Sequence, residues 1–354
     1  MTRLEVCVPV TTVWTSPEAP RDLDSPAVAD APDPGAWTAA LDAEPPSSDE
    51  PGAPSRGRIG LHGRTLTQLL FGEPVDVVEE RGAWARVVAP WQPSSADPAG
   101  YPGWVRRAHL ATPAVTPTGT PAGPAARGYV VARRTSLTFD QQSPGGDVAT
   151  TAATVELSFG TALALAPNTG TGPGTGPGTG PGTGEGDAVR VLLPGGGTGR
   201  LPRVDIACHD PQHADVQDGP AAGLAALEAA ARFRGLTYLW GGASAWGLDC
   251  SGLVHLVHRA LGRRIPRDAF DQADAVEPVP LDAVRPGDLY FFARPSERVY
   301  HVGFASRPVE ADGTRWMLHA PETGGGIEDA PLAPHRVATL VSAGRVPAAG
   351  TSSD

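Results

Sequence analysis

The segment Leu248-Asp249-Cys250-Ser251-Gly252 stands immediately before an apolar pattern that is typical of an amphipathic helix. Apolar residues recur there at the i, i+3, i+4 spacing of one helix face, namely Leu253, Leu256, Val257, Ala260 and Leu261. The same face, extended backwards, reaches Cys250. We therefore expect Cys250 in the first turn of a helix, on the side turned towards the protein. Because the N–H groups and the dipole at a helix start favour an anion, we expect a lowered thiol pKa and a nucleophilic thiolate.

The chain has 354 residues, a length that predicts more than one domain. Its 44 Gly and 38 Pro residues predict long loops and linkers. The net charge of −11 argues against nucleic acid or an anionic membrane as a partner, and no apolar stretch is long enough to span a membrane. The first residues lack the pattern of a secretory signal, so the sequence predicts a cytoplasmic protein unless the true start codon lies upstream.

Residues 1–112 show short strand patterns joined by turns, which predict a small all-β barrel. These patterns cover residues 4–15, 67–78, 84–88 and 100–105. The Pro-rich acidic stretch from Ser16 to Arg56 is expected to be a loop that wraps this domain, and the alternative for part of it is a short helix from Ala36 to Leu41.

The same unit recurs in residues 128–206, after a linker of Pro, Thr and Gly at 113–127. Phe159-Gly160 repeats Phe71-Gly72, and Val189-Arg190-Val191-Leu192 repeats Ala85-Arg86-Val87-Val88, with Ala188 in place of Trp84. The second copy is longer because Thr-Gly-Pro-Gly repeats fill residues 169–184, a composition that forms no core. We therefore expect two related barrels, the second with a flexible insert.

Residues 207–349 change to helical patterns followed by strand patterns. Leu224 to Phe233 is Ala-rich and predicts a helix, with Gly235 as its stop. After the Cys250 helix, strand patterns follow at 288–293, 299–305, 316–319 and 337–345. This order predicts an α+β domain in which helices pack on an antiparallel sheet.

A cysteine nucleophile needs a base within hydrogen-bond reach, and the base needs an orienting partner. His301 is the candidate base, because strand alternation puts it on a face with the small residues Gly303 and Ala305. The opposite face is expected to carry Tyr300, Val302 and Phe304.

His319 lies in the next strand pattern, so antiparallel pairing places it on the same face as His301. We expect the Cys250 helix to pack across that face. His255 and His258 fall off the buried stripe of the helix and are expected to have no role. A lone strand histidine is more often structural or solvated than catalytic, and the pairing with a helix-start cysteine is what favours the catalytic interpretation.

Several motifs follow one another between residues 221 and 345. They are Tyr238-Leu239-Trp240-Gly241-Gly242, Leu248-Asp249-Cys250-Ser251-Gly252, Ile265-Pro266-Arg267-Asp268 with Gln272, Arg285-Pro286-Gly287-Asp288-Leu289, His301-Val302-Gly303 and His319-Ala320. In this order they resemble the NlpC-type family of cell-wall peptidases, which implies a papain-like fold.

The upstream units resemble bacterial SH3-like domains. The matching residues are Val13-Trp14, Thr67-Gln68, Phe71-Gly72-Glu73 and Gly100-Tyr101-Pro102-Gly103-Trp104. Two such domains before this peptidase are similar to the γ-D-glutamyl-L-diamino-acid endopeptidases that act on murein peptides.

The resemblance implies a mechanism that agrees with the pattern of residues. The Cys250 thiolate attacks the amide carbon, His301 takes and returns the proton, and His319 orients and polarises His301. The backbone N–H of Cys250, with the Tyr238 hydroxyl as a second donor, stabilises the oxyanion before water hydrolyses the thioester. No cofactor is implied.

Four further residues have two interpretations each. By resemblance, Asp249 and Ser251 hold the D-glutamyl part of the substrate, although both residue types also cap helices well. By resemblance, Glu73 and Tyr101 bind the free amine of an N-terminal L-Ala, and the alternative is a surface Glu and a barrel-packing Tyr. A carboxylate that faces an ammonium group would reject intact murein, whose L-Ala is amide-linked. Ala269 stands where some relatives place a serine near the substrate.

The sequence thus predicts a cysteine peptidase that cleaves the γ-D-glutamyl–diamino-acid bond of small murein peptides with a free N-terminal L-Ala. An exported hydrolase of intact cell wall is the alternative with the same chemistry. A module that binds wall peptides without cleaving them would lack Cys250 or His301, and both are present. A zinc site at Cys208, His209 and His213 is a further alternative, but its spacing provides no fourth ligand nearby.

Overall fold

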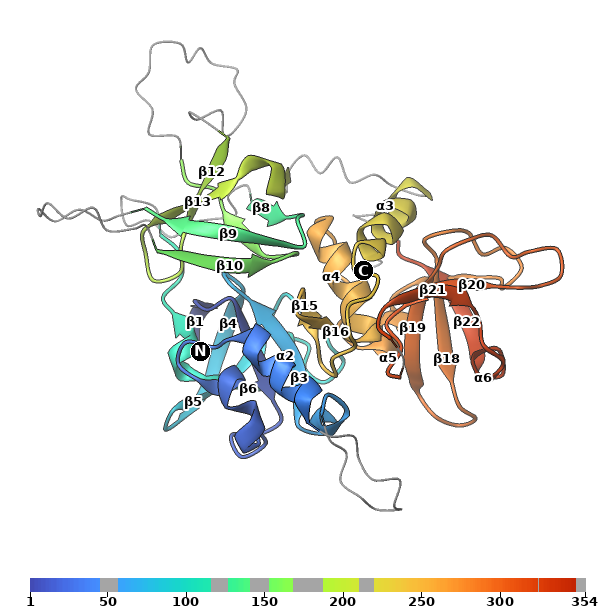
Figure 1. The fold of residues 1–354 in the computed structure, drawn as a ribbon, viewed down its shortest axis with the longest axis horizontal. Coiled ribbons are helices and arrows are strands. Elements are labelled where there is room, and N and C mark those ends of the chain that lie inside the picture. The colour runs from blue at the N-terminus through green and yellow to red at the C-terminus, as the bar shows by residue number, and fades with distance from the viewer. Residues whose placement is uncertain are drawn as a thin grey trace, which may run out of the picture.

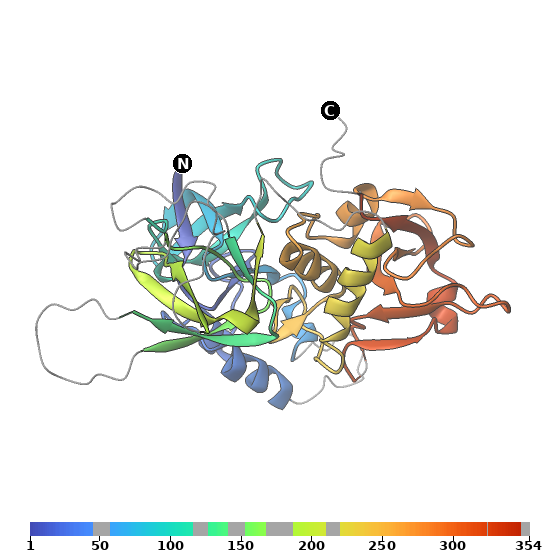
Figure 2. The ribbon, with the colours of Figure 1, turned by 90° about the horizontal axis from the view of Figure 1, so that it is seen from above.

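The computed structural model describes residues 1–44, 57–115, 127–140, 153–167, 187–209, 220–323 and 325–347. Figure 1 shows two β units at one side of the molecule and a unit of helices and strands at the other. Helices α3 (Pro220–Ala231) and α4 (Cys250–Ala260) lie between the β units and the C-terminal sheet (Figure 2). The Thr-Gly-Pro-Gly insert at 169–184 and the linker residues 116–126 lie outside the described residues.

The first β unit is a seven-stranded sheet in the order β3-β2-β6-β5-β4-β1-β7. Its strands are β1 (Thr2–Val6), β2 (Val10–Trp14), β3 (Thr65–Leu70), β4 (Pro74–Arg81), β5 (Trp84–Ala89), β6 (Tyr101–Arg106) and β7 (Leu110–Ala111), with the 3-10 turn η3 (Arg107–His109) before β7. The predicted strands are confirmed, and the segment 4–15 is divided into β1 and β2.

The segment between β2 and β3 contains helical elements as well as loops. They are η1 (Asp22–Asp24), α1 (Ser25–Val28), α2 (Pro34–Ala43) and η2 (Ile59–Leu61). The loop favoured for this stretch is wrong at 34–43, where the alternative of a short helix at Ala36 to Leu41 is confirmed as α2. Asp33 caps this helix by accepting a hydrogen bond from the Ala36 N–H at 2.8 Å. Trp37 and Leu41 pack with Trp14 of β2, so the segment covers one side of the first unit.

The second β unit consists of two sheets, in the orders β10-β9-β13-β12 and β11-β8-β14. Its elements are β8 (Arg127–Val130), β9 (Arg134–Phe139), β10 (Thr154–Ser158), β11 (Ala162–Ala164), β12 (Ala188–Leu192), β13 (Thr198–Pro202), η4 (Arg203–Asp205) and β14 (Ile206–His209). The repeated Phe-Gly pair lies in equivalent turns, between β3 and β4 and between β10 and β11. Gly72 and Gly160 have φ of 77° and 79°, the left-handed region in which glycine meets no steric penalty.

The C-terminal unit confirms the α+β pattern. Its antiparallel six-stranded sheet has the order β17-β22-β18-β19-β20-β21. The strands are β17 (Glu277–Val279), β18 (Leu289–Ala293), β19 (Val299–Ala305), β20 (Trp316–His319), β21 (Glu328–Pro331) and β22 (Leu340–Arg345), with a small ribbon of β15 (Ala243–Ser244) and β16 (Gly247–Leu248) and the short helices α5 (Ala269–Asp274) and α6 (Pro334–Val337). The sequence did not predict β17, β21, α5 or α6, and Val337 belongs to α6 rather than to the last strand.

Helix α4 is buried around its whole circumference. The predicted stripe of Leu253, Leu256 and Val257 is fully buried, but His255 and His258 are buried too, at 1% and 2% exposure. The expectation that these histidines lie off the buried face is therefore wrong. The reason is that α4 is covered on one side by the C-terminal sheet and on another by the second β unit, where Gly160 packs against Leu256.

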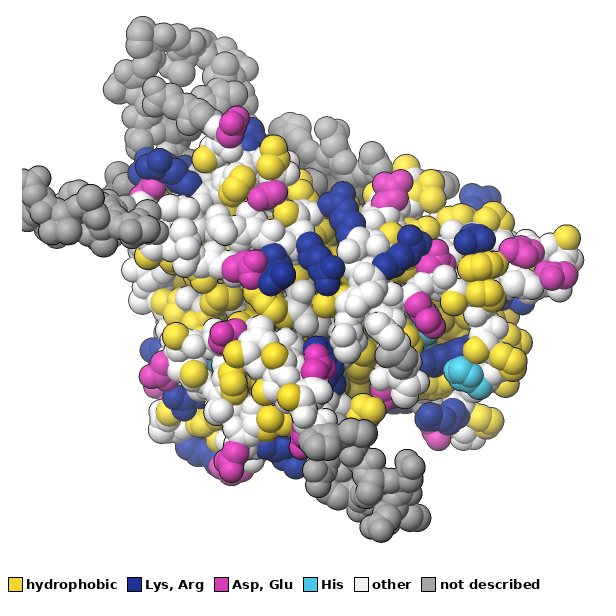
Figure 3. Space-filling model, in the orientation of Figure 1, with side chains coloured by type: hydrophobic (Ala, Val, Ile, Leu, Met, Phe, Trp, Pro, Cys, Tyr) yellow, Lys and Arg dark blue, Asp and Glu magenta, His cyan; other side chains and the backbone are white. Residues whose placement is uncertain are grey.

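The surface carries charges of both signs. Arg side chains and carboxylates are interspersed on the face of the molecule seen in Figure 3. Within the described residues, no helix is long and apolar enough to cross a membrane.

Candidate active site

Cys250 is the first residue of α4, as predicted. Asp249 caps this helix, because its carboxylate accepts a hydrogen bond from the Gly252 N–H at 2.6 Å. A Cβ on Gly252 would lie only 2.1 Å from the carbonyl oxygen of Gly242, so only glycine lets the helix start approach the preceding glycine turn. The N–H of Cys250 has no acceptor within the helix, since the first N–H groups of a helix have none.

The pKa of the Cys250 thiol differs from the expectation of a lowered value. Burial, together with the charge of Asp249, raises it to about 12. Hydrogen bonds from the backbone N–H groups of Val302 and Ser251 and the charge of Arg267 act in the opposite direction without compensating. The helix start does favour the thiolate, but the loss of water around a fully buried sulfur outweighs it. In this structure Cys250 is a thiol.

His301 and His319 are hydrogen bonded to each other. The Nε2 atom of His301 lies 2.8 Å from Nδ1 of His319, and the two side chains are almost fully buried. Strands β19 and β20 pair antiparallel, so the predicted common face of the two histidines is confirmed. Gly303 makes room for this pair, because a Cβ there would lie 2.8 Å from the Cβ of His319.

The Cys250 helix packs on the other face of the sheet from the one expected. Leu253 and Val257 of α4 cluster with Val302 and Phe304. His301 instead lies against the ring of Phe292, which belongs to a separate apolar cluster. The expectation that α4 crosses the histidine face is therefore wrong. Cys250 nevertheless meets the histidine strand, because the Val302 N–H acts on its sulfur.

A β-bulge next to His301 explains part of this difference. Phe292 pairs with His301 and the following residue Ala293 pairs with Val299, which leaves Tyr300 as the extra residue. Bulges interrupt strict alternation and re-aim neighbouring side chains. Tyr300 therefore packs in the same cluster as Phe292, beside His301 rather than opposite to it.

Both histidines are neutral at physiological pH. Burial, together with the nearby charge of Arg336, holds the pKa of His301 well below its usual value. The same two causes, with His335 as a third, lower the pKa of His319 to about 3. A neutral imidazole has a nitrogen lone pair that can accept a proton, although the lowered pKa makes His301 a weaker base than a free imidazole. Since its Nε2 is engaged with His319, the atom left for the thiol proton is Nδ1.

A buried arginine organises the residues on either side of Cys250. Arg267, only 1% exposed, binds the Asp249 carboxylate through Nη2 at 2.7 Å and the Ser251 hydroxyl through Nη1 at 3.0 Å. Its Nε donates to the Thr67 hydroxyl of the first β unit at 2.8 Å. The sequence named Arg267 within a motif but gave it no role. No local signal distinguishes it, because Arg263, Arg264 and Asp268 nearby are charged as well.

Tyr238 lies near the nucleophile. It is 6% exposed, and its pKa is raised by burial and by the neighbouring Cys250, Asp249 and Glu322. A raised pKa keeps the phenol protonated, so its hydroxyl remains a hydrogen-bond donor. Its role as an oxyanion donor stays a prediction.

The first β unit reaches the site through Tyr101, but not through Glu73. The Tyr101 hydroxyl donates to the Asp268 carboxylate at 2.9 Å. Glu73 is completely buried, and its carboxylate already accepts hydrogen bonds from Arg259, the Leu70 N–H and Gln92. No oxygen of Glu73 is left for a substrate ammonium, which corrects the expected role of this residue. The carboxylate that Tyr101 contacts is instead Asp268, a residue to which the sequence analysis gave no role.

The alternative zinc site has no support in the described part of the chain. His213 lies outside the described residues, and the described residues contain no group of three metal-ligating side chains. Cys208 is an exposed free cysteine.

Comparison with known proteins gives consistent results. Residues 235–342 match the model of the NlpC/P60 family. The chain is 33% identical over 324 residues to the γ-D-glutamyl-L-lysine dipeptidyl-peptidase of Bacillus subtilis, covering 90% of each chain. It is 28% identical to the protein of the same name from Bacillus cereus, covering 92% of this chain and 85% of that one.

The fold is similar to a solved structure as well. A crystal structure of an NlpC/P60 family protein from Bacillus cereus superposes with a TM-score of 0.79 at 26% identity, covering 98% of this chain and 99% of that chain. The likeness therefore extends over both β units and the C-terminal unit.

Proposed function

Because this chain belongs to the NlpC/P60 family of cysteine peptidases, we propose that it hydrolyses the bond between the γ-carboxyl of D-glutamate and a diamino acid in small murein peptides. The observation that carries the proposal is the 2.8 Å His301–His319 hydrogen bond beside a cysteine at a helix start. The names of two relatives that match most of the chain support the substrate class.

The catalytic steps follow from the proton states of the site. As Cys250 Sγ attacks the amide carbon, its proton passes to Nδ1 of His301. The raised pKa of the thiol favours proton transfer to His301 during the attack. The Cys250 N–H and the Tyr238 hydroxyl receive the oxyanion. His301 then returns the proton to the leaving amine, and water, deprotonated by His301, hydrolyses the thioester.

The acyl part of the substrate is proposed to lie between the first β unit and α4. Asp249 and Ser251 serve as helix cap and Arg267 partner, and their position beside Cys250 also makes them the wall of the D-glutamyl pocket. The Tyr101–Asp268 pair takes the role expected of Glu73 and Tyr101 and receives the free amine of L-Ala. A half-buried carboxylate bound by one hydroxyl keeps an oxygen for an ammonium group.

We also propose that the two β units are SH3-like domains, which the repeated Phe-Gly turns at matching φ support. A substrate with a free L-Ala amine has already been released from the sugar chains. We therefore propose that the reaction belongs to the recycling of wall peptides and takes place in the cytoplasm.

The test compares three substrates with the full-length protein. These are L-Ala-γ-D-Glu-L-Lys, the same peptide with an acetylated N-terminus, and intact sacculi. We expect release of L-Ala-D-Glu from the first substrate alone. Cleavage of sacculi without cleavage of the free peptide would contradict the proposal and favour the exported hydrolase. The tripeptide with meso-diaminopimelate in place of Lys, measured in parallel, gives the preference for the diamino acid.

Two cysteine variants identify the nucleophile. Cys250→Ala is expected to reduce kcat/KM by about a thousandfold or more. Cys208→Ala is the matched control, because Cys208 is a free and exposed cysteine, and its activity should be unchanged. Turnover by Cys250→Ala close to that of the native protein would remove Cys250 from the mechanism.

A further inference from the structure

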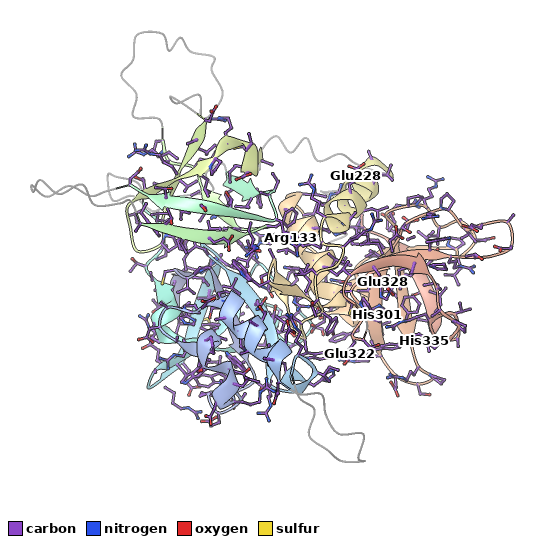
Figure 4. All side chains as sticks on the ribbon, viewed as in Figure 1. Arg133, Glu228, His301, Glu322, Glu328 and His335 are labelled. Carbon is purple, nitrogen blue, oxygen red and sulfur yellow. The ribbon has the colours of Figure 1, made fainter. Side chains whose placement is uncertain are left out.

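Glu328 is the cross-strand neighbour of His319. Strands β20 and β21 pair antiparallel with His319 opposite Glu328. An Oε1 atom of Glu328 lies 3.5 Å from Nε2 of His319, the ring nitrogen that does not bind His301. The histidine side chain is 8% exposed and the glutamate 53% exposed, so the carboxylate covers the outer edge of the buried ring. Figure 4 shows Glu328 and His301 on the same side of the C-terminal unit.

The position of one hydrogen on each ring follows from the chemistry. For Nδ1 of His301 to accept the thiol proton, the single hydrogen of this neutral ring must be on Nε2. That N–H donates to Nδ1 of His319, which must then be without a hydrogen. His319 is also neutral, because its pKa is lowered to about 3. Its only hydrogen is therefore on Nε2, the atom that faces Glu328.

We propose that Glu328 is a positioning residue, which holds His319 in the tautomer that His301 needs. The inference rests on the proposed function, in which Cys250 and His301 carry out the reaction. Without an acceptor at Nε2, His319 can place its hydrogen on Nδ1 instead. Two N–H groups would then face each other between the rings, and His301 could keep its hydrogen bond only by moving its own hydrogen to Nδ1, where it would no longer accept the thiol proton.

Glu328 also has the right charge for the step that follows. The groups that act on His301 are Arg336 and His335 of α6, together with its hydrogen-bonded neighbour His319 of β20. Arg336 and His335 also lower the pKa of His319. The charges of α6 therefore disfavour a cation at His301. The negative charge of Glu328, next to His319, has the sign that would favour one. We expect loss of this carboxylate to raise the barrier to forming the imidazolium.

The kinetic test uses Glu328→Ala, Glu328→Gln and Glu328→Asp, with Glu297→Ala as the matched control. Glu297 is an exposed glutamate of the same unit, paired with Arg294. We expect kcat of Glu328→Ala to fall about tenfold, less than the loss of a general base itself, with KM within twofold. The acidic limb of kcat/KM should move to lower pH in Glu328→Ala and Glu328→Gln, and return towards the native position in Glu328→Asp. Glu297→Ala should match the native protein.

A spectroscopic readout makes the test independent of turnover. ¹⁵N NMR of histidine-labelled, unliganded protein should show His319 protonated at Nε2 in the native chain and as a mixture of tautomers in Glu328→Ala. An Nδ1-protonated His319 in the native chain, or an unchanged tautomer and pH profile in Glu328→Ala, overturns the inference. If the native chain cleaves none of the peptides, the proposed function fails, but the tautomer still decides the role of Glu328.

Discussion

The same Phe-Gly turn occurs once in each β unit, and the two copies contact the Cys250 helix in different ways. In the first unit, the residue after the turn is Glu73, which is fully buried and paired with Arg259 of α4. In the second unit, the equivalent residue is Thr161, which is equally buried but whose hydroxyl has no hydrogen-bond partner among the described residues. There the contact is made by Gly160, where a Cβ would lie 2.4 Å from Cδ1 of Leu256.

Leu256 and Arg259 are three positions apart and therefore on one side of α4. The second unit holds this side by close packing, and the first unit holds it by a buried ion pair. The first unit adds polar contacts to the motif residues near Cys250, through Thr67 to Arg267 and Tyr101 to Asp268, whereas the second unit contacts the backbone of Ala245 through the Ser158 hydroxyl. The same β turn therefore supports the Cys250 helix in two different ways. In the second unit it supports the helix by close packing, and in the first unit it supports the helix by a buried ion pair.

The largest expected effect comes from breaking the ion pair of the first turn. Arg259→Met leaves the Glu73 carboxylate buried without a counter-charge, and such a change costs about 3–5 kcal/mol. The free energy of unfolding, measured with urea, should fall by this amount. The double variant Glu73→Gln with Arg259→Met removes both charges and should recover most of the loss. If Arg259→Met alone costs less than about 1 kcal/mol, the first turn is not fixed by charge.

Alanine at the two turn glycines separates the two roles. Both positions have φ near 80°, which costs a residue with a Cβ about 1–2 kcal/mol. Gly160→Ala also pushes into Leu256 of α4, whereas Gly72→Ala pushes into Leu163 of the second β unit. We expect similar losses of stability in the two variants but a fall of several-fold in kcat only for Gly160→Ala, because α4 carries Cys250.

Thermal unfolding and peptide cleavage measured side by side check this comparison. Equal losses of kcat in Gly160→Ala and Gly72→Ala would contradict the view that the second turn alone supports the helix by shape.

The sequence predicted those features that depend on local pattern. The stripe of Leu253, Leu256 and Val257 defines α4, and alternation with antiparallel pairing places His301 beside His319. The edge strand β21 was missed because Glu328-Asp329-Ala330-Pro331 has no alternation of apolar residues, and proline is confined to such edges. Residues that owe their burial to a partner in another unit were also missed.

Glu73 and Arg259 show why this second group could not be predicted. They are 186 positions apart, and each by itself has the pattern of a solvated surface charge. His255 and His258 are buried by other parts of the C-terminal unit: Nδ1 of His255 lies 2.9 Å from the carbonyl oxygen of Ile265, and the ring of His258 stacks on Phe304 of β19. The prediction of a lowered pKa for Cys250 was wrong for a similar reason. The helix dipole can be inferred from the sequence, but the loss of water around the buried sulfur cannot.

The smallest expected effect is at the second turn, where the substitution should raise the free energy of unfolding rather than lower it. Thr161→Val replaces a buried hydroxyl that has no partner by a methyl group of the same size. Since a buried donor without a partner carries its full desolvation cost, the variant should be as stable as the native protein or more stable by up to about 1 kcal/mol. Urea unfolding checks this, and kcat should not change. Destabilisation by more than about 1 kcal/mol would show that a water bridges the hydroxyl, and that the second turn, like the first, is held by polar contacts.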